Sequence, residues 1–321
     1  MSGEAAFIDL LRALARDPAA RGLMDDAAVL EVGGARLVLT HDIIVEGVHF
    51  LPDDPPADIA WKLVAVNLSD LAAKGATPLG ALLGYALGKA DWDRAFAGGL
   101  RAALAAFDMP LLGGDTVAMP AECARALGLT AIGRADGPVP SRGGARPGDE
   151  LWVSGAIGDA GAGLALLRAG EAEPARLVER YRRPRPRLEA GRRLAQLARA
   201  MMDVSDGLLI DAGRMAAASG CGVAIALEAV PLSADYLALR GEGRAARLAA
   251  ATAGDDYELL FAAPPEAAAR LRALAAEIGL ALTRIGAFAA GAGLALTHAG
   301  AAVALPGRLG FEHGADKGES C

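Results

Sequence analysis

Apolar positions along the chain follow helical spacing in some segments and strand-like spacing in others. Near the N-terminus a helix is expected over about residues 4–16, because its apolar side chains share one face: Phe7, Leu10, Leu11 and Leu14. Two apolar runs follow, Ala27–Val32 and Arg36–Thr40, and Gly33-Gly34 between them predicts a hairpin. The chain therefore begins with one helix and one pair of antiparallel strands.

The rest of the first half reads as helices and strands in alternation. Asp58 is predicted to cap a helix that runs to about Lys74, with Gly75 after its end. Asp91 is predicted to cap a second helix, which ends near Phe107. The expected strands are Leu79–Leu87 and two segments near residues 111–117 and 127–133.

A segment rich in glycine and proline, Asp136–Gly148, interrupts this pattern and is expected to form the seam between two domains. The pattern then restarts after this segment. The expected strands are Glu150–Val153, Met201–Val204, Tyr257–Ala262 and two segments near residues 282–288 and 293–305. The expected helices are one that includes residues 164–167, one that ends near Ala200, one that follows Ser205-Asp206-Gly207, and one after Pro264-Pro265. We predict an α/β (α+β) fold with an N-terminal domain over residues 1–137 and a C-terminal domain over residues 138–321.

The balance of charges limits the classes of partner that the protein is expected to bind. The 321 residues carry a formal net charge of −7, and 53% of them are hydrophobic, which is enough for a sizeable core. Lysine occurs only at positions 62, 74, 89 and 317, so nearly every cation is arginine. An acidic chain with scattered arginines argues against nucleic acid or an anionic membrane as the main partner.

The sequence does not predict export or membrane insertion. The N-terminus has acidic residues at positions 4 and 9 and does not resemble a signal peptide. Between Arg284 and Arg308 the only ionisable side chain is His298, but the glycines and Pro306 in this stretch favour short strands over a spanning helix. Three scattered cysteines exclude a disulfide framework, and no CxxC pair indicates zinc. A cytoplasmic protein is expected.

Several aspartates stand at the ends of strongly apolar segments, or inside them, beside glycine, serine or threonine: Asp25, Asp26, Asp42, Asp70, Asp115 and Asp203. A carboxylate at the end of a buried strand is costly unless it is paired or coordinated, and few lysines are available to pair these. Clustered carboxylates suit hard cations, and Mg²⁺ favours a few carboxylates together with substrate phosphates. Each aspartate alone also fits a cap or a turn, so a magnesium site depends on their convergence.

The two halves of the chain echo each other at two motifs. The first is Asn67-Leu68-Ser69-Asp70, which recurs as Asp203-Val204-Ser205-Asp206. The second is Gly113-Gly114-Asp115-Thr116, which recurs as Gly254-Asp255-Asp256-Tyr257. An internal duplication and similar local chemistry both account for this echo.

Other machinery for phosphate or nucleophile chemistry is missing from the sequence. There is no GxxxxGK[ST] P-loop, no HRD or DFG of a protein kinase, and no GxSxG of a serine hydrolase. The glycine-rich run Gly155–Gly163 does not match GxGxxG, and close packing of a helix on a strand explains its glycines equally well. What remains is an enzyme that uses ATP or another phosphate compound and holds it through metal ions on carboxylates.

Seven short motifs follow one another between residues 22 and 313: Asp25-Asp26-Ala27-Ala28; Thr40-His41-Asp42 leading into Val45-Glu46-Gly47-Val48-His49-Phe50; Val66-Asn67-Leu68-Ser69-Asp70-Leu71-Ala72-Ala73-Lys74-Gly75-Ala76; Gly113-Gly114-Asp115-Thr116; Asp203-Val204-Ser205-Asp206-Gly207-Leu208; Gly254-Asp255-Asp256-Tyr257-Glu258-Leu259; and Gly310-Phe311-Glu312-His313. Together they are highly specific, and the chain resembles the thiamine-monophosphate kinase family. The resemblance implies membership of the aminoimidazole-ribonucleotide-synthetase-like superfamily.

The resemblance implies an N-terminal α/β domain whose mixed sheet pairs in a homodimer, a C-terminal α/β domain, and ATP bound between the two. The implied reaction transfers the γ-phosphoryl group of ATP directly to thiamine monophosphate and yields thiamine diphosphate and ADP. Because the acceptor is itself a phosphate, Mg²⁺ ions that bridge both anions would neutralise their repulsion and align the attack. A phosphate oxygen is already deprotonated at neutral pH, so no strong general base is needed.

The resemblance also implies roles for individual residues. Several Mg²⁺ ions would be held by Asp26, Thr40, Asp42, Asp70, Asp115, Asp203 and Asp206. Of these, the catalytic residues would be Asp42, Asp70 and Asp115. ATP would contact Gly114, Asp115, Arg142 and Ser205. Thiamine monophosphate would be held by His49, Asp255 and Phe311, since an aromatic face and a carboxylate both stabilise a cationic thiazolium.

One position departs from the family pattern. His41 stands where the family has a second hydroxyl residue before the aspartate. If that hydroxyl binds metal, its role here would pass to Thr40, to a backbone carbonyl or to the ring of His41 itself.

Three alternatives fit the sequence less well. Selenophosphate synthetase would need a reactive cysteine or selenocysteine with a nearby lysine in its N-terminal segment, and none precedes Asp25. The hydrogenase-maturation dehydratase carries a C-terminal cysteine, but the context of Cys321, Lys-Gly-Glu-Ser-Cys, is unlike that tail and reads as a flexible end. A metal-dependent binding module is the alternative outside enzymes, and no EF-hand loop supports it.

Overall fold

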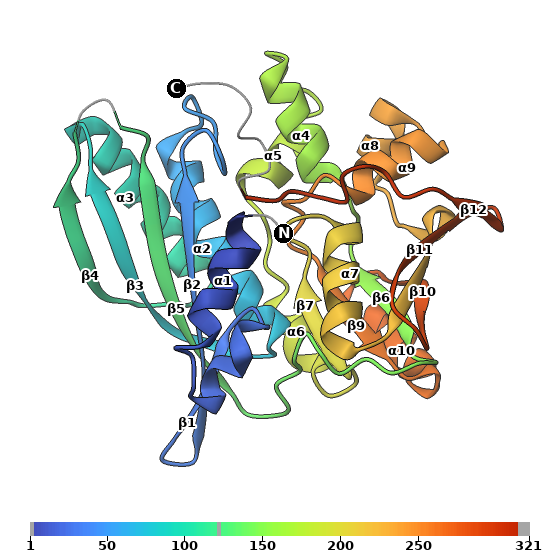
Figure 1. Ribbon diagram of the computed structural model, residues 1–321. Helices are drawn as coiled ribbons and strands as arrows, with labels where there is room; N and C mark the ends of the chain where they lie inside the picture. The colour runs from blue at the N-terminus through green and yellow to red at the C-terminus, as the bar shows by residue number, and fades with distance from the viewer. Residues whose placement is uncertain (1–2, 121–122, 314–321) are drawn as a thin grey trace.

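The computed structural model describes residues 3–120 and 123–313, and it contains two β-sheets with helices packed on them (Figure 1). Residues up to Ala135 build the first sheet, and residues from Glu150 onward build the second. This arrangement confirms the predicted α/β (α+β) fold. The domain boundary at 137/138 falls in the irregular segment between the two sheets and stays a prediction. Cys321 lies outside the described residues.

The N-terminal sheet is mixed, with the strand order β1-β2-β5-β3-β4. Its strands are β1 (Ala28–Val32), β2 (Ala35–Val45), β3 (Thr77–Leu87), β4 (Leu111–Ala118) and β5 (Ala126–Ala135). The helices of this half are α1 (Gly3–Arg12), η1 (Pro18–Leu23), α2 (Pro56–Ala73) and α3 (Ala90–Ala106). β1 and β2 form the predicted hairpin, β3 and β4 are parallel, and every residue of the edge strand β4 is exposed.

The C-terminal sheet has seven strands in the order β12-β11-β8-β10-β6-β9-β7. They are β6 (Glu150–Ser154), β7 (Ala200–Asp203), β8 (Gly222–Ala226), β9 (Leu259–Ala263), β10 (Leu282–Ala289), β11 (Gly293–His298) and β12 (Ala301–Val303). The helices are α4 (Asp159–Arg168), α5 (Ala175–Arg182), α6 (Leu188–Leu194), α7 (Leu208–Ser219), η2 (Leu227–Ala229), α8 (Ala234–Arg240), α9 (Arg244–Ala251), η3 (Pro265–Ala267) and α10 (Ala268–Ile278).

Helix α2 joins the two halves, because it lies between the two sheets and is buried along most of its length (Figure 1). It contacts β2 and β5 of its own domain, and β7 and α6 of the other. Ala72 and Ala73 belong to one apolar cluster with Trp152 and Phe261. The approach of α6 is so close that a Cβ on Gly191 would stand 2.0 Å from the carbonyl oxygen of Ala72. Helix α2 is therefore packed closely against both halves of the chain.

Some local predictions are wrong. Helix α1 ends at Arg12, and Asp58 and Asp91 lie in the first turns of α2 and α3 instead of capping them. Proline fixes a helical φ, so Pro56 begins α2 two residues before Asp58. The helix expected to reach Ala200 is the short α6. The sequence pattern also missed β8, α5, α8 and α9, which are short or lie in arginine-rich segments.

The glycine-rich stretch near the C-terminus forms β10, β11 and β12, as the sequence predicts. Within the part of the chain that the structure describes, no helix has both the length and the apolar character needed to cross a membrane.

Candidate active site

A cavity of about 590 Å³ lies between the two domains and receives side chains from both. Ten of the thirteen predicted site residues line it: Asp26, His49, Asp42, Asp70, Arg142, Asp203, Ser205, Asp206, Asp255 and Phe311. An eleventh, Thr40, is buried, and its hydroxyl donates a hydrogen bond to Asp70, which lines the cavity. Residues from opposite ends of the sequence thus converge on one place.

Four of these side chains form what we call the acidic cluster: Asp26, Asp42, Asp70 and Asp203. Asp26 precedes β1, Asp42 lies on β2, Asp70 on α2, and Asp203 ends β7. The Asp70 and Asp203 residues are 9% and 4% exposed. The hydroxyl of Ser69 donates to Asp203 at 2.5 Å, so two members of the cluster receive hydroxyl donors from their neighbours.

The acidic cluster holds more negative charge than its surroundings balance. Burial raises the pKa of Asp42 to about 6, and Asp26 and Asp206 contribute to this rise. Burial and the charge of Asp26 raise the pKa of Asp203 to about 8. The pKa of Asp70 is also well above its usual value, because it is buried and faces Asp42 and Asp203. Such a site favours either protons or added cations.

Asp26 differs from the rest of the cluster because two fixed cations hold it. Its carboxylate contacts the Lys74 ammonium at 2.7 Å and the Arg142 guanidinium at 2.5 Å. Burial alone would raise the pKa of Asp26, but these two cations lower it to about 2. Lys74 also contacts Asp25 at 2.5 Å and donates to the carbonyl oxygen of Met201 at 3.0 Å, so it links α2 to β7.

The donor set of the cavity fits magnesium. Its candidate ligands are carboxylate and hydroxyl oxygens, which Mg²⁺ prefers, and the cluster carries uncompensated negative charge. Among the described residues, no group of three or more His, Cys, Asp or Glu side chains is arranged to hold a metal ion.

The cavity also carries aromatic and imidazole rings and one further carboxylate. The Phe311 N–H donates to the carbonyl oxygen of Asp206 at 2.8 Å, which fixes the C-terminal segment over the cavity. The ring of His313 lies 5.4 Å from that of His49 and 4.9 Å from that of Phe311, measured between centroids. Asp255 is the further carboxylate, and its backbone N–H donates to the carbonyl oxygen of Ser205 at 2.7 Å.

His49 presents a defined tautomer to the cavity. Its Nδ1 accepts a hydrogen bond from the Val45 N–H at 3.0 Å, so in the neutral ring the proton resides on Nε2. Burial lowers the pKa of His49, which favours this neutral form. The ring can therefore donate one hydrogen bond from Nε2.

Two family models match the chain. The N-terminal domain of the AIR synthase related proteins matches residues 24–135, and their C-terminal domain matches residues 146–299. A thiamine-monophosphate kinase of Caulobacter vibrioides is 43% identical over 316 residues, which is 95% of this chain and 89% of the relative. The chain belongs to the thiamine-monophosphate kinase family. A second member, from Salmonella typhimurium, is 40% identical over 271 residues and 82% of each chain.

A solved structure of the thiamine-monophosphate kinase family also matches in three dimensions. The structure of AaThiL complexed with AMPPCP and TMP has a TM-score of 0.83 and 31% sequence identity, and the match covers 97% of each chain. The two-domain arrangement is therefore shared over nearly the full length of both proteins.

The position where this chain departs from the thiamine-monophosphate kinase pattern does not face the acidic cluster. Along β2, Thr40 and Asp42 point toward α2, and His41 between them is exposed on the other face. The Nδ1 atom of His41 lies 2.9 Å from the hydroxyl oxygen of Thr130 on β5. At this position only the backbone of the residue faces the cluster. The ring of His41 is therefore removed from the candidate ligands.

The structure does not bring Gly114 and Asp115 into the cavity. Both lie on β4, the exposed edge of the N-terminal sheet, and β4 is separated from β2 by β5 and β3. Three strand spacings amount to about 14 Å. The roles assigned to these two residues stay predictions that the cavity of a single chain does not satisfy.

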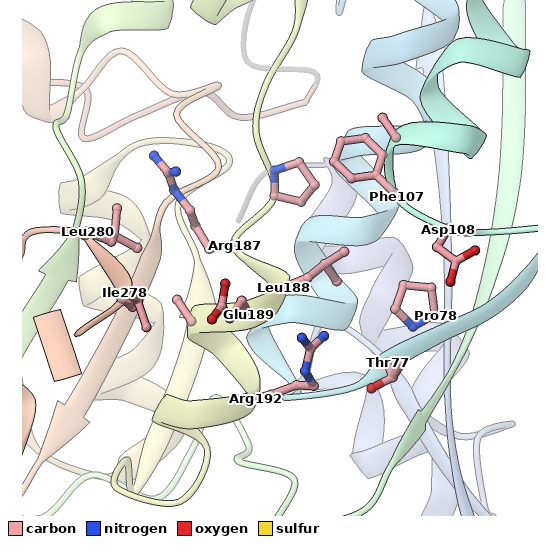
Figure 2. Close-up of a pocket in the computed structure, with 14 residues that line it drawn as sticks. Thr77, Pro78, Phe107, Asp108, Arg187, Leu188, Glu189, Arg192, Ile278 and Leu280 are labelled. Carbon is pink, nitrogen blue, oxygen red and sulfur yellow. The ribbon is translucent and has the colours of Figure 1, made fainter. Parts of the chain in front are cut away.

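A second hollow, of about 730 Å³, also lies at the seam between the domains (Figure 2). Thr77, Pro78, Phe107 and Asp108 line it from the first domain, and the labelled residues from the second are Arg187, Leu188, Glu189, Arg192, Ile278 and Leu280. None of the thirteen predicted residues belongs to it. The guanidinium of Arg187 at this hollow is bound by the carboxylate of Glu258.

Sequence reasoning missed three charged groups in or beside the candidate site. Lys62 and Lys74 are buried lysines inside or beside α2, and Glu4 of α1 lines the cavity. A lysine in a helical segment normally lies at the surface, so the pattern alone does not single it out. The sequence signal that could have found Lys62 and Lys74 is the rarity of lysine, since two of only four lysines in the chain are in this region.

Proposed function

We propose that this chain transfers the γ-phosphoryl group of ATP to thiamine monophosphate, which yields thiamine diphosphate and ADP. The observation that carries the proposal is the convergence of ten predicted residues on one cavity. The family relatives are thiamine-monophosphate kinases, and the AaThiL structure holds AMPPCP, an analogue of ATP, together with TMP. In the reaction an oxygen of the acceptor phosphate attacks the γ-phosphorus, and the bond from that phosphorus to ADP breaks.

We propose the acidic cluster, Thr40 and Asp206 as the magnesium end of the site. When bound, Mg²⁺ neutralises the repulsion between donor and acceptor phosphates and orients them. Asp42 and Asp70 supply carboxylate oxygens toward the cavity, and Thr40 fixes the direction of Asp70 through its hydroxyl. The Lys74 ammonium contacts the carboxylate of Asp26, and its positive charge offsets part of the repulsion within the cluster. The cluster therefore keeps its arrangement despite its negative charge.

Arg142 and Ser205 are proposed contacts for ATP. Arg142 comes from the irregular segment between the domains and lines the cavity. Its Nε is buried and, within the described residues, has no hydrogen-bond partner. A buried guanidinium with an unused donor is suited to a phosphate oxygen, because that bond would remove the cost of the unsatisfied N–H.

The ring-bearing end is proposed for thiamine monophosphate. Phe311 offers an apolar face and Asp255 a negative charge, and both would stabilise a cationic thiazolium. The Nε2–H of His49 would donate to a phosphate oxygen of the acceptor.

We further propose that two chains pair through their N-terminal sheets. Large apolar side chains are exposed on this sheet, and Ile43, Leu82 and Val117 are 52%, 41% and 51% exposed. Such a concentration of exposed apolar surface is typical of an interface. In a homodimer the edge strand β4 would be covered, and Gly114 and Asp115 would face the second chain.

Residues 1–137 would form this pairing domain and residues 138–321 would complete the site. A cytoplasmic location stays a prediction of the sequence.

The proposed reaction predicts strict dependence on both partners. ATP depletion is expected only when thiamine monophosphate and Mg²⁺ are both present, and thiamine diphosphate should appear in equal amount. Free thiamine, which lacks the acceptor phosphate, serves as the matched control. Equal ATP consumption with free thiamine, or without any acceptor, would show that the proposal is wrong.

The charge of the acidic cluster predicts how Mg²⁺ affects stability at different pH values. Asp42 and Asp203 have folded-state pKa values of about 6 and 8, raised from 3.8. Between pH 4 and 8 the metal-free folded protein therefore binds more protons than the unfolded chain, and its stability falls as the pH rises. Mg²⁺ competes with those protons, so it should raise the melting temperature by a few degrees, roughly, at pH 8 and by much less at pH 5.

This dependence is measured by thermal denaturation with and without Mg²⁺, at matched ionic strength set with NaCl. An equal rise at the two pH values would contradict the assignment of the acidic cluster as the metal site.

A further inference from the structure

Lys62 is a buried lysine for which the proposed reaction has no use. It lies on α2 and is 2% exposed, although the chain places arginine at nearly every other cationic position. Burial of an ammonium group is costly in free energy unless its partners replace the lost water. The partners of Lys62 should therefore explain why the charge is there.

Three groups surround the Lys62 ammonium, and they come from three separate segments. It donates to the carbonyl oxygen of His49 at 2.8 Å and to Asp255 Oδ2 at 2.9 Å. It also lies 4.0 Å from the centre of the Tyr181 ring. An ammonium is a compact charge with three donors, whereas the planar fork of arginine could not reach these groups in the same geometry.

Two of the three partners belong to the acceptor end of the cavity. His49 and Asp255 both line it, and they come from different domains. Lys62 therefore bridges the seam at the place where the acceptor would bind. It does not line the cavity itself.

Asp255 is held at both carboxylate oxygens. Oδ2 accepts from Lys62, and Oδ1 accepts from the hydroxyl of Tyr257 at 3.2 Å. The backbone of Asp255 has a φ of 62°, in the left-handed region that non-glycine residues rarely occupy. Its side chain thus leaves the backbone in an unusual direction, and Lys62 and Tyr257 together determine where the charge points.

We propose that Lys62 is a positioning residue for the acceptor substrate. It sets the orientation of the Asp255 carboxylate and of the His49 backbone, so that a cationic ring with a phosphate tail meets both groups at once. It touches neither the reacting phosphates nor ATP. This inference rests on the proposed function, because the acceptor is the molecule named there.

The test replaces Lys62 by methionine, which keeps the length of the side chain and removes its charge. The KM for thiamine monophosphate should rise at least about 10-fold, while kcat and the KM for ATP stay within about 2-fold of wild type. Calorimetry without ATP should show the same loss of affinity for thiamine monophosphate. A general structural defect would change both KM values and would not select the acceptor.

Two further variants complete the design. Lys89→Met removes an exposed lysine and should leave both KM values unchanged. Combining Lys62→Met with Asp255→Asn should raise the acceptor KM no more than the larger single effect, because the two residues act as one unit. If Lys62→Met does not fold, Lys62→Arg keeps the buried charge and should still raise the acceptor KM selectively.

The outcomes separate this inference from the proposed function. A wild-type protein that does not phosphorylate thiamine monophosphate would overturn the function. An active wild type whose Lys62 variants alter both KM values alike, alter neither, or combine additively with Asp255→Asn would overturn the role of Lys62 alone.

Discussion

Replacing Asp70 by asparagine is expected to lower kcat on the order of 10³-fold without unfolding the protein. Loss of a group behind a metal ligand already costs about 10–100-fold in typical metal sites, so loss of a ligand costs more. The asparagine side chain would keep an oxygen to accept the hydroxyl of Thr40. The substitution would also replace a buried carboxyl whose pKa is raised by burial and by its acidic neighbours.

This variant separates activity from stability in an unusual way. Because asparagine resembles the protonated carboxyl, the melting temperature of the metal-free protein should be equal to that of wild type or higher. Asp91→Asn is the matched control, since the Asp91 side chain is 97% exposed, and it should leave kcat unchanged. Near-normal turnover of Asp70→Asn at saturating Mg²⁺ would remove Asp70 from the metal site.

Replacing Asp115 by asparagine is expected to lower turnover at least about 100-fold, although Asp115 does not line the cavity of its own chain. The reason is the proposed pairing of two N-terminal sheets, in which β4 of one chain would supply Asp115 to the cavity of the other. A heterodimer of one Asp70→Asn chain and one Asp115→Asn chain would then contain one intact site. Isolated with two different affinity tags, it should show about half of the wild-type rate.

The control for this experiment is a heterodimer of Asp70→Asn and Asp203→Asn chains. Both aspartates line the same cavity, so each of its two sites lacks one of them and it should stay inactive. An inactive heterodimer of the Asp70 and Asp115 variants would show that Asp115 does not act across the interface. A monomer in solution would contradict the pairing itself.

Most residues of the candidate site stand out in the sequence because they lie in short motifs of unusual composition, and ten of the thirteen line one cavity. Asp42 and Asp203 each end an apolar run, and Asp70 interrupts one, so each carboxylate is conspicuous. The hairpin of β1 and β2 was equally visible, since glycines separate two apolar runs. In these places the residue types of a motif and its position in a strand or helix both indicate the same structure.

The remainder depends on contacts between distant segments. The start of α2 at Pro56 overrides the capping tendency of Asp58. Helix α5 buries Leu177 and Tyr181 and contacts α2 and α4, which the short arginine-rich segment does not reveal by itself. The partners of Lys62 are equally distant, since Asp255 lies 193 residues away in sequence. Neither the helix or strand propensity of a segment nor the spacing of residues within it predicts a contact between two distant segments.

The position of α2 between the two sheets has a consequence for folding. Its inner residues complete the apolar core of the first domain, and Ala72 and Ala73 complete a cluster of the second. Neither half can melt without exposing apolar surface of the other, so the two sequence domains form one cooperative unit. The candidate site is built on the helix that both halves need, so melting of either half would also remove the site.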